Sequence, residues 1–207
     1  MKKTFDTKSI VVLGLLTALT LVFSFTPIGT IPIGPLSITL NVIPIALAAV
    51  VLGPVGGATI GAIFGFCSFL QCLGIGVPSA MGAILFEINP FFAFVQRFVP
   101  RVLVGLLVGF VYKGVRKISN TYVSCAVAGF CSAFFNTALF MSALVLLYGN
   151  TEYVQGLMGG KNVILFICSF VGINAVCEMI CSTIVTAAVG AALYKAKVLP
   201  APAAAKN

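Results

Sequence analysis

Charged residues are what this sequence has least of. They make up 8% of its 207 residues, whereas 60% are hydrophobic, and the mean hydropathy is +1.18. A soluble domain carries about 25% charged residues, because its surface must be hydrated. Most of this protein's surface therefore cannot face water. The sequence predicts an all-α, polytopic membrane protein whose helices each use about 20 residues to cross the bilayer.

Side chains that perform chemistry are also scarce. The sequence has no histidine and only four acidic residues. Intramembrane hydrolases and transferases usually need a Ser–His dyad, paired aspartates or a metal cluster, so we do not expect an enzyme. The seven cysteines lie mostly in apolar segments without zinc-ribbon spacing. Cysteines in such segments typically serve as small packing residues, so we expect neither a metal nor a cofactor.

An ATP-binding loop is missing as well. The segment Gly160-Lys161-Asn162 fails the Gly-x-x-x-x-Gly-Lys-Ser/Thr pattern at both ends. If the protein takes part in uphill transport driven by ATP, another chain must hydrolyse the nucleotide.

Prolines and glycines divide the chain into six apolar segments. The junction Gly53-Pro54 separates the second from the third, and we expect these two to form a tight hairpin. Residues 74–96 are uneven and predict a loop with short helical pieces. Residues 1–199 are expected to form one six-helix transmembrane domain, followed by a flexible tail at 200–207. The six predicted spans are 9–25, 38–52, 55–73, 97–112, 122–148 and 163–194.

Basic residues lie just outside these segments and report topology. Six spans place both termini on one side of the membrane, and nine of the twelve Lys and Arg residues fall on that side. The positive-inside rule then predicts that both termini are cytoplasmic. The same placement accounts for the net charge of +8, so this charge does not indicate a nucleic-acid-binding protein. The three exceptions are Arg97, Arg101 and Lys161.

Small residues recur at every fourth position, which permits close helix packing in lipid. In the third and fourth spans we expect these stripes to pack inside the bundle. They comprise Gly53, Gly57, Gly61 and Gly65, then Gly105 and Gly109. Gly14 and Ala18 repeat the spacing in the first span.

Polar residues at membrane depth are costly and are the candidates for a binding site. Glu178 lies in the sixth span one turn after Asn174, and Asn136 lies in the fifth. Arg97 and Arg101 share a face at the start of the fourth. Structural roles remain open for all five, as a buried pair, as interhelical hydrogen bonds or as arginines that reach the headgroups. Together they predict a polar pocket that opens outward.

The outward loops 27–37, 74–96 and 149–162 contain residues suited to a lid. The aromatic candidates cover a bound ligand in one interpretation and face lipid or the core of the loop in the other. They are Phe86, Phe91, Phe92 and Tyr153.

The order and spacing of several motifs over residues 8–195 resemble the substrate-binding S component of energy-coupling factor (ECF) vitamin transporters. The motifs lie at the ends and centres of the predicted spans. They are Gly14-Leu-Leu-Thr-Ala18, Ser37-Ile-Thr-Leu-Asn41-Val-Ile-Pro44, Val51-Leu-Gly-Pro54, Gly61-Ala-Ile-Phe-Gly65, Ile88-Asn-Pro90, Val99-Pro-Arg101, Asn136-Thr137 and Asn174-Ala-Val-Cys-Glu178.

This resemblance implies a six-helix bundle in the bacterial cell membrane that binds one vitamin-like molecule from outside. It implies partners too: a transmembrane coupling subunit and two ABC-type ATPases. In the family, a small-xxx-small motif in the first helix touches the coupling subunit, and here that motif is Gly14-xxx-Ala18. The resemblance adds Asn41, in the second motif, to the substrate-binding residues predicted above.

Pantothenate is the ligand that best matches these groups. Its carboxylate suits Arg97 or Arg101, and its hydroxyls and amide suit the asparagines and Glu178. Some relatives have a histidine where this chain has Val42, so their ligand is not transferred. Two alternatives remain: a solitary proton-coupled carrier that uses Glu178, and a structural or pore-forming membrane protein.

Overall fold

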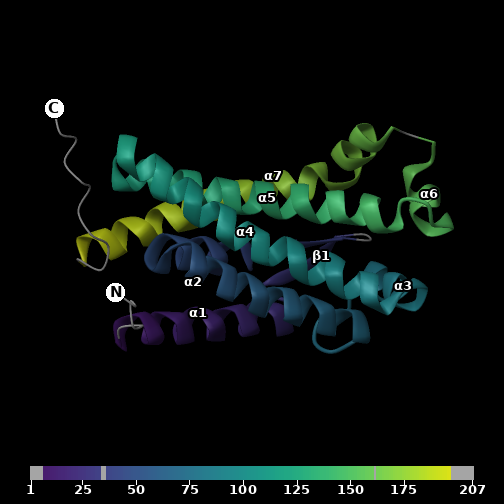
Figure 1. Ribbon diagram of the computed structural model, residues 1–207, viewed down its shortest axis with the longest axis horizontal. Coiled ribbons are helices and arrows are strands. Elements are labelled where there is room, and N and C mark those ends of the chain that lie inside the picture. Colours follow the sequence, from purple (N-terminus) through teal and green to yellow (C-terminus); the bar gives the residue numbers. More distant parts are fainter. Residues whose placement is uncertain (1–6, 34–35, 161, 197–207) are drawn as a thin grey trace.

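The computed structural model describes residues 7–33, 36–160 and 162–196 (Figure 1). Helices dominate, with one short antiparallel strand pair in which Thr30 faces Thr39. In chain order the elements are α1 (Thr7–Phe25), β1 (Thr30–Ile33), β2 (Leu36–Thr39), α2 (Val42–Leu70), the 3-10 turn η1 (Gln71–Leu73), α3 (Ala80–Ile88), α4 (Pro90–Ile118), α5 (Thr121–Tyr148), α6 (Glu152–Met158) and α7 (Val163–Lys195).

Five helices in the described part of the chain are long and apolar enough to cross a membrane. This confirms an all-α, polytopic membrane protein. The five segments are Thr7–Phe25, Val42–Leu73, Pro90–Ile118, Thr121–Tyr148 and Asn174–Lys195. The second of them covers two of the six predicted spans, because α2 runs through the Gly53-Pro54 junction.

Helix α2 reverses its direction at this junction. Gly53 has φ 79° and ψ −170°, a conformation that is not helical and that favours glycine. A Cβ atom on Gly57 would lie 2.9 Å from the Cβ of Ala49. Residues eight positions apart in a straight helix are separated by about 12 Å. The two halves of α2 therefore fold back on each other, as the Gly-Pro junction predicts.

The first half of α2 forms the centre of the bundle. Every residue from Val42 to Val50 is buried. Ser132 of α5 donates a hydrogen bond of 2.7 Å to the carbonyl oxygen of Val42. Hydrogen bonds from Asn41 and Gln71, next to the two ends of α2, both reach Ser24 of α1. The pocket described below is built on this hairpin.

Glycines bring the second half of α2 into backbone contact with α4. A Cβ on Gly57 would overlap the carbonyl oxygen of Gly105, and one on Gly61 would overlap that of Arg101. Further along, a Cβ on Gly109 would overlap the backbone of Pro54. The expectation that these stripes pack inside the bundle is confirmed.

Helix α4 begins earlier than the sequence predicted. It starts at Pro90, two turns before residue 97, so that boundary was wrong. Asn89 caps the helix by accepting a hydrogen bond of 3.1 Å from the amide of Phe92, and proline fits the first helical position. The prediction of short helical pieces in 74–96 is correct for α3. The hydroxyl of Tyr148 anchors α3 through its one proton, which the carbonyl oxygens of Leu85 and Asn89 share in a bifurcated hydrogen bond.

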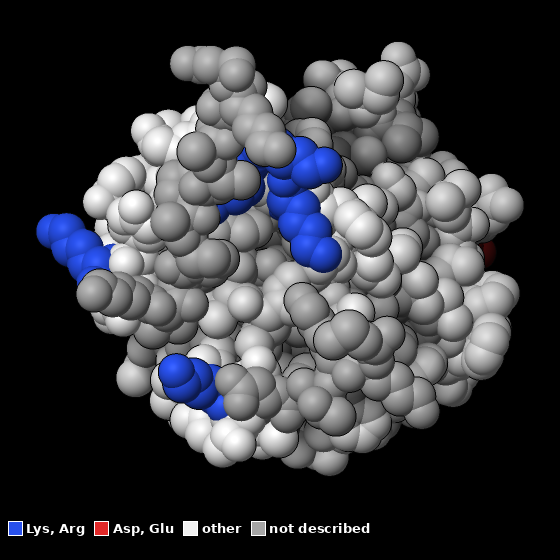
Figure 2. All heavy atoms as spheres, turned by 60° about the vertical axis from the view of Figure 1, so that its left-hand side comes forward, with Lys and Arg blue, Asp and Glu red and all other residues white. Residues whose placement is uncertain are grey.

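Helix α1 begins and helix α7 ends at the same end of the bundle (Figure 1). Figure 2 looks onto this end and shows lysine and arginine side chains projecting from it. Lys113 lies there beside Gly53, at the turn of α2. The predicted tail at 200–207 lies outside the described residues, as does Lys161. Helices α3 and α6 lie at the opposite end.

Candidate functional site

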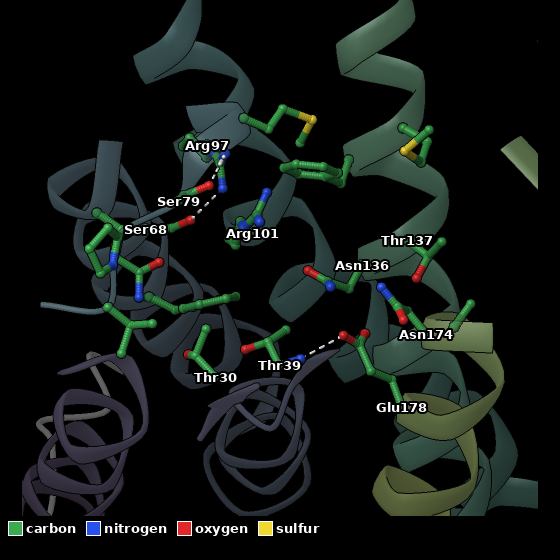
Figure 3. Close-up of a pocket in the computed structure, with 18 residues that line it drawn as sticks. Thr30, Thr39, Ser68, Ser79, Arg97, Arg101, Asn136, Thr137, Asn174 and Glu178 are labelled. Carbon is green, nitrogen blue, oxygen red and sulfur yellow. Dashed lines mark hydrogen bonds between the residues drawn. The ribbon is translucent and has the colours of Figure 1, made fainter. Parts of the chain in front are cut away.

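Five of the six predicted binding residues line one pocket. They come from three helices that are far apart in the sequence: Arg97 and Arg101 from α4, Asn136 from α5, and Asn174 and Glu178 from α7. Strands β1 and β2, the second half of α2 and the segment before α3 complete the wall. Figure 3 shows the arginines on one side and the asparagines with the glutamate on the other.

The arginine side of the pocket holds two buried guanidinium groups. Arg97 donates hydrogen bonds to the hydroxyls of Ser68, at 3.3 Å, and Ser79, at 3.1 Å. Arg101 has one long contact of 3.5 Å, to the carbonyl oxygen of Gln96. The Nε atoms of both arginines are buried without a hydrogen-bond partner. Only 6% of Arg97 and 5% of Arg101 is exposed. Neither side chain extends outward as an arginine that reaches the headgroups would.

Phe140 of α5 supports both guanidinium groups. The Cζ atom of Arg101 lies 4.4 Å from the centroid of its ring, and that of Arg97 lies 5.2 Å from it. Phe64 of α2 lies near Arg101 as well, at 5.2 Å. A cation over an aromatic face is stabilised by the ring quadrupole, most strongly where water is excluded. The aromatic rings thus hold charges for which burial alone would be unfavourable.

The opposite side of the pocket is anchored by Glu178. Its Oε1 accepts a hydrogen bond of 2.7 Å from the backbone amide of Thr39, the last residue of β2. Only 4% of Glu178 is exposed. Asn136 lies next to the carboxylate, and its Oδ1 atom is buried without a partner. This hydrogen bond joins helix α7 to the strand pair.

The charges that line the pocket do not balance. Two buried arginines face one buried glutamate, and every hydrogen-bond partner of the guanidinium groups among the described residues is neutral. Glu87 and Glu152, the other acidic residues that the structure describes, are exposed. A buried charge without a counter-ion is expensive. The pocket is thus suited to a ligand that carries one negative charge together with hydrogen-bonding groups.

Asn41, the sixth predicted binding residue, is not in the lining. It is fully buried just before α2, and its Nδ2 donates to the hydroxyl of Ser24 at 3.1 Å. Its backbone amide donates to Thr39 Oγ1, so it contacts a residue that lines the pocket. The hydrogen bond to Ser24 directs this side chain toward α1 instead of the pocket.

The proposed aromatic lid is not brought to the pocket either. Phe91 is 69% exposed, and Phe86 packs against Phe69 at 5.9 Å between ring centroids. Phe92 lies against Tyr148. Tyr153 packs against an apolar cluster that contains Tyr148 and the pocket residue Phe140, but it is not in the lining itself. The segments that border the pocket are instead the strand pair and residues 77–81.

A family model described as "ECF transporter, substrate-specific component" matches residues 8–190. The chain belongs to this family. It is similar to the pantothenic acid transporter PanT of Lactococcus lactis subsp. cremoris, with 29% identity over 79% of this chain and 81% of the relative. It is also similar to the pantothenate transporter PanT of Leuconostoc mesenteroides, with 29% identity over 79% and 80% of the two chains.

In this S component, Gly14 and Ala18 lie on the outer face of α1. Both are exposed, and a Cβ on Gly14 would have no atom within 4 Å. The other glycine stripes lie against neighbouring helices, whereas the space around Gly14 is open and Ala18 is exposed. That difference agrees with the expected contact to a partner and excludes packing inside the bundle.

Sequence reasoning missed several residues that line the pocket of this S component. Ser68, Ser79 and Phe140 hold the arginines, and Thr30 and Thr39 come from the strand pair. Serine, threonine and phenylalanine are common in membrane helices and loops, so their identity carried no signal. Only Ser79 had a signal in the sequence, because serine is a preferred N-cap residue and Ser79 is the N-cap of α3.

Proposed function

We propose that this S component captures pantothenate from outside a bacterial cell and delivers it inward as part of an ECF-type ABC importer. A transmembrane coupling subunit and two ABC ATPases supply the energy. The chain has six transmembrane helices, with the hairpin in α2 counted as two, and both termini face the cytoplasm. Gly14 and Ala18 form the contact to the coupling subunit.

The excess of one positive charge in the buried pocket carries the proposal. Pantothenate has one carboxylate, one amide and two hydroxyls on a short, flexible chain. Its carboxylate lies near Arg97 and Arg101, where it compensates the unbalanced charge. Its hydroxyls and amide then reach Asn136, Asn174 and Glu178 on the other side. The names of the two relatives point to the same ligand.

The orientation rests on the basic end of the bundle. The described cations there are Lys8, Lys113, Arg116, Lys117 and Lys195, a distribution that the positive-inside rule assigns to the cytoplasm. The pocket borders β1, β2 and α3, which are remote from that end, so it faces the outside.

Calorimetric titration of the purified chain tests the ligand. Pantothenate should bind with a Kd in the micromolar range or below, and pantothenol, which has an alcohol in place of the carboxylate, should bind at least tenfold more weakly. Thiamine and biotin are controls of different shape. If pantothenate at micromolar concentrations produced no heat of binding, the proposal would be wrong.

Uptake in reconstituted vesicles tests the mechanism. Accumulation of pantothenate should require the coupling subunit, both ATPases and ATP. Uptake by the chain alone that collapses with the proton gradient would instead establish a solitary proton-coupled carrier, with buried Glu178 as its proton site.

A further inference from the structure

The two pocket arginines differ in what already occupies their donors. Arg97 donates to Ser68 of α2 through Nη1 and to Ser79 through Nη2. The only hydrogen bond of Arg101 to a described residue is the 3.5 Å contact with a backbone carbonyl. A contact of that length is weak. Arg101 therefore keeps most of its five N–H donors for another acceptor.

Their surroundings differ in the same sense. Arg101 lies over the rings of Phe64 and Phe140, and these contacts use none of its donors. Arg97 instead reaches a hydroxyl with a second structural task. Ser79 Oγ accepts a hydrogen bond from the backbone amide of Gly82 and so caps α3. Nη2 of Arg97 donates a hydrogen bond to the same oxygen. Arg97 connects α4 to the cap of α3 and to α2.

We infer that Arg101 binds the carboxylate of the ligand, whereas Arg97 is a positioning residue that holds α3 and the adjoining wall of the pocket. This inference rests on the proposed function, because it assigns the two ends of the ligand. The planar donor fork of Arg101 matches a carboxylate. The hydrogen bonds of Arg97 are used within the protein, on Ser68 and Ser79, so Arg97 does not hold the carboxylate itself.

The experiment compares two variants and two ligands. Arg101→Gln and Arg97→Gln each remove one guanidinium and keep a polar side chain. Pantothenate and pantothenol differ only in the charged group, so the ratio of their dissociation constants measures recognition of the carboxylate. Wild-type protein should prefer pantothenate by about 30-fold, which is typical for hydrogen bonds to a buried charge.

Arg101→Gln should reduce this ratio to below about threefold while the affinity for pantothenol stays within threefold of wild type. Retained pantothenol binding also demonstrates that the variant is folded. Arg97→Gln should keep the ratio and weaken both ligands by the same factor, about tenfold. If Arg97→Gln does not fold, Ser68→Ala removes one partner of Arg97 and should give a smaller effect of the same kind.

Hydrogen exchange without ligand supplies an independent readout. Amides of Ala80–Ile88 should exchange faster in Arg97→Gln and at the wild-type rate in Arg101→Gln. The inference fails if the two variants exchange roles, if wild type binds both ligands equally, or if neither variant changes exchange in α3. A wild-type protein that binds neither ligand would instead overturn the proposed function.

Discussion

Helices α2 and α4 pack together along most of their length, but what lies between them changes from one end to the other. Near the turn of α2, Gly57 and Gly105 place backbone against backbone, and no side chain intervenes. The glycine stripe ends at Gly65, and the pocket begins beside its last turn, where Phe64 is in the lining. One turn further, Ser68 accepts a hydrogen bond from Arg97.

The difference shows how one helix pair provides both a seal and a binding site. Without a hydrophobic effect between helices in lipid, close backbone approach supplies the packing energy. The glycine part therefore closes the bundle toward the basic end. In the other part, hydrogen bonds and contacts with aromatic rings hold the side chains. A bound ligand can replace some of these hydrogen-bond partners. Four predictions test this contrast, in order of decreasing effect on the isolated chain.

Gly57→Ala should have the largest effect. Its Cβ would overlap the carbonyl oxygen of Gly105, so α2 and α4 must separate, at a cost of about 3 kcal/mol in the free energy of unfolding. Thermal unfolding in detergent measures the loss. Gly14→Ala is the matched control, because that position has open space and should leave stability unchanged. Equal melting curves for the two variants would contradict a backbone seal.

Glu178→Ala should weaken pantothenate binding about tenfold without unfolding the bundle. The change removes the acceptor for the Thr39 amide and loosens the strand pair at the pocket. Titration calorimetry measures the affinity. Glu178→Gln keeps a carbonyl acceptor and should retain most of the binding. If Glu178→Ala binds as tightly as wild type, Glu178 neither contacts the ligand nor holds the strand pair at the pocket.

Asn41→Ala should separate stability from binding. It removes a hydrogen bond to Ser24, so the free energy of unfolding should fall by about 1 kcal/mol. Affinity should stay within twofold, because the side chain is not in the pocket. Asn136→Ala, in the lining, is the contrasting variant and should lose binding several-fold. A similar loss of affinity in Asn41→Ala would return that residue to the binding site.

The double variant Gly14→Leu, Ala18→Leu should have the smallest effect on the isolated chain. Both positions are exposed on α1, so stability and ligand affinity should match wild type. Co-purification with the coupling subunit and ATP-driven uptake should be abolished, because two large side chains prevent close approach. Intact uptake would show that this face of α1 is not the docking site.

Much of the site could be predicted because polar groups are so rare in this chain. Arg97, Arg101, Asn136, Asn174 and Glu178 were singled out by their depth alone, and one pocket contains all five. The glycine stripes were equally readable from their spacing. The start of α4 was wrong because the apolar segment 74–96 hides an N-cap at Asn89, whose side chain decides where the helix begins.

Other features had no local signal. The hydrogen bond between Thr39 and Glu178 joins residues that are 139 positions apart, and neither neighbourhood in the sequence indicates the other. Asn41 illustrates the opposite case. Its place in a family motif predicted binding, but its side chain donates a hydrogen bond to Ser24 of α1 and is not in the lining of the pocket.

The sequence by itself determined the solvent of this protein, the helices that lipid requires, and the few polar residues worth attention. These follow from composition and spacing, because the cost of a polar group in a bilayer does not depend on the fold. Only the tertiary structure decided which polar groups share one space and which of their donors are already used. The polar groups converge on one pocket because α2 reverses at Gly53 and because helices that are distant in the sequence contact one another. Those same contacts distinguish Arg97 from Arg101, two residues that look equivalent in the sequence.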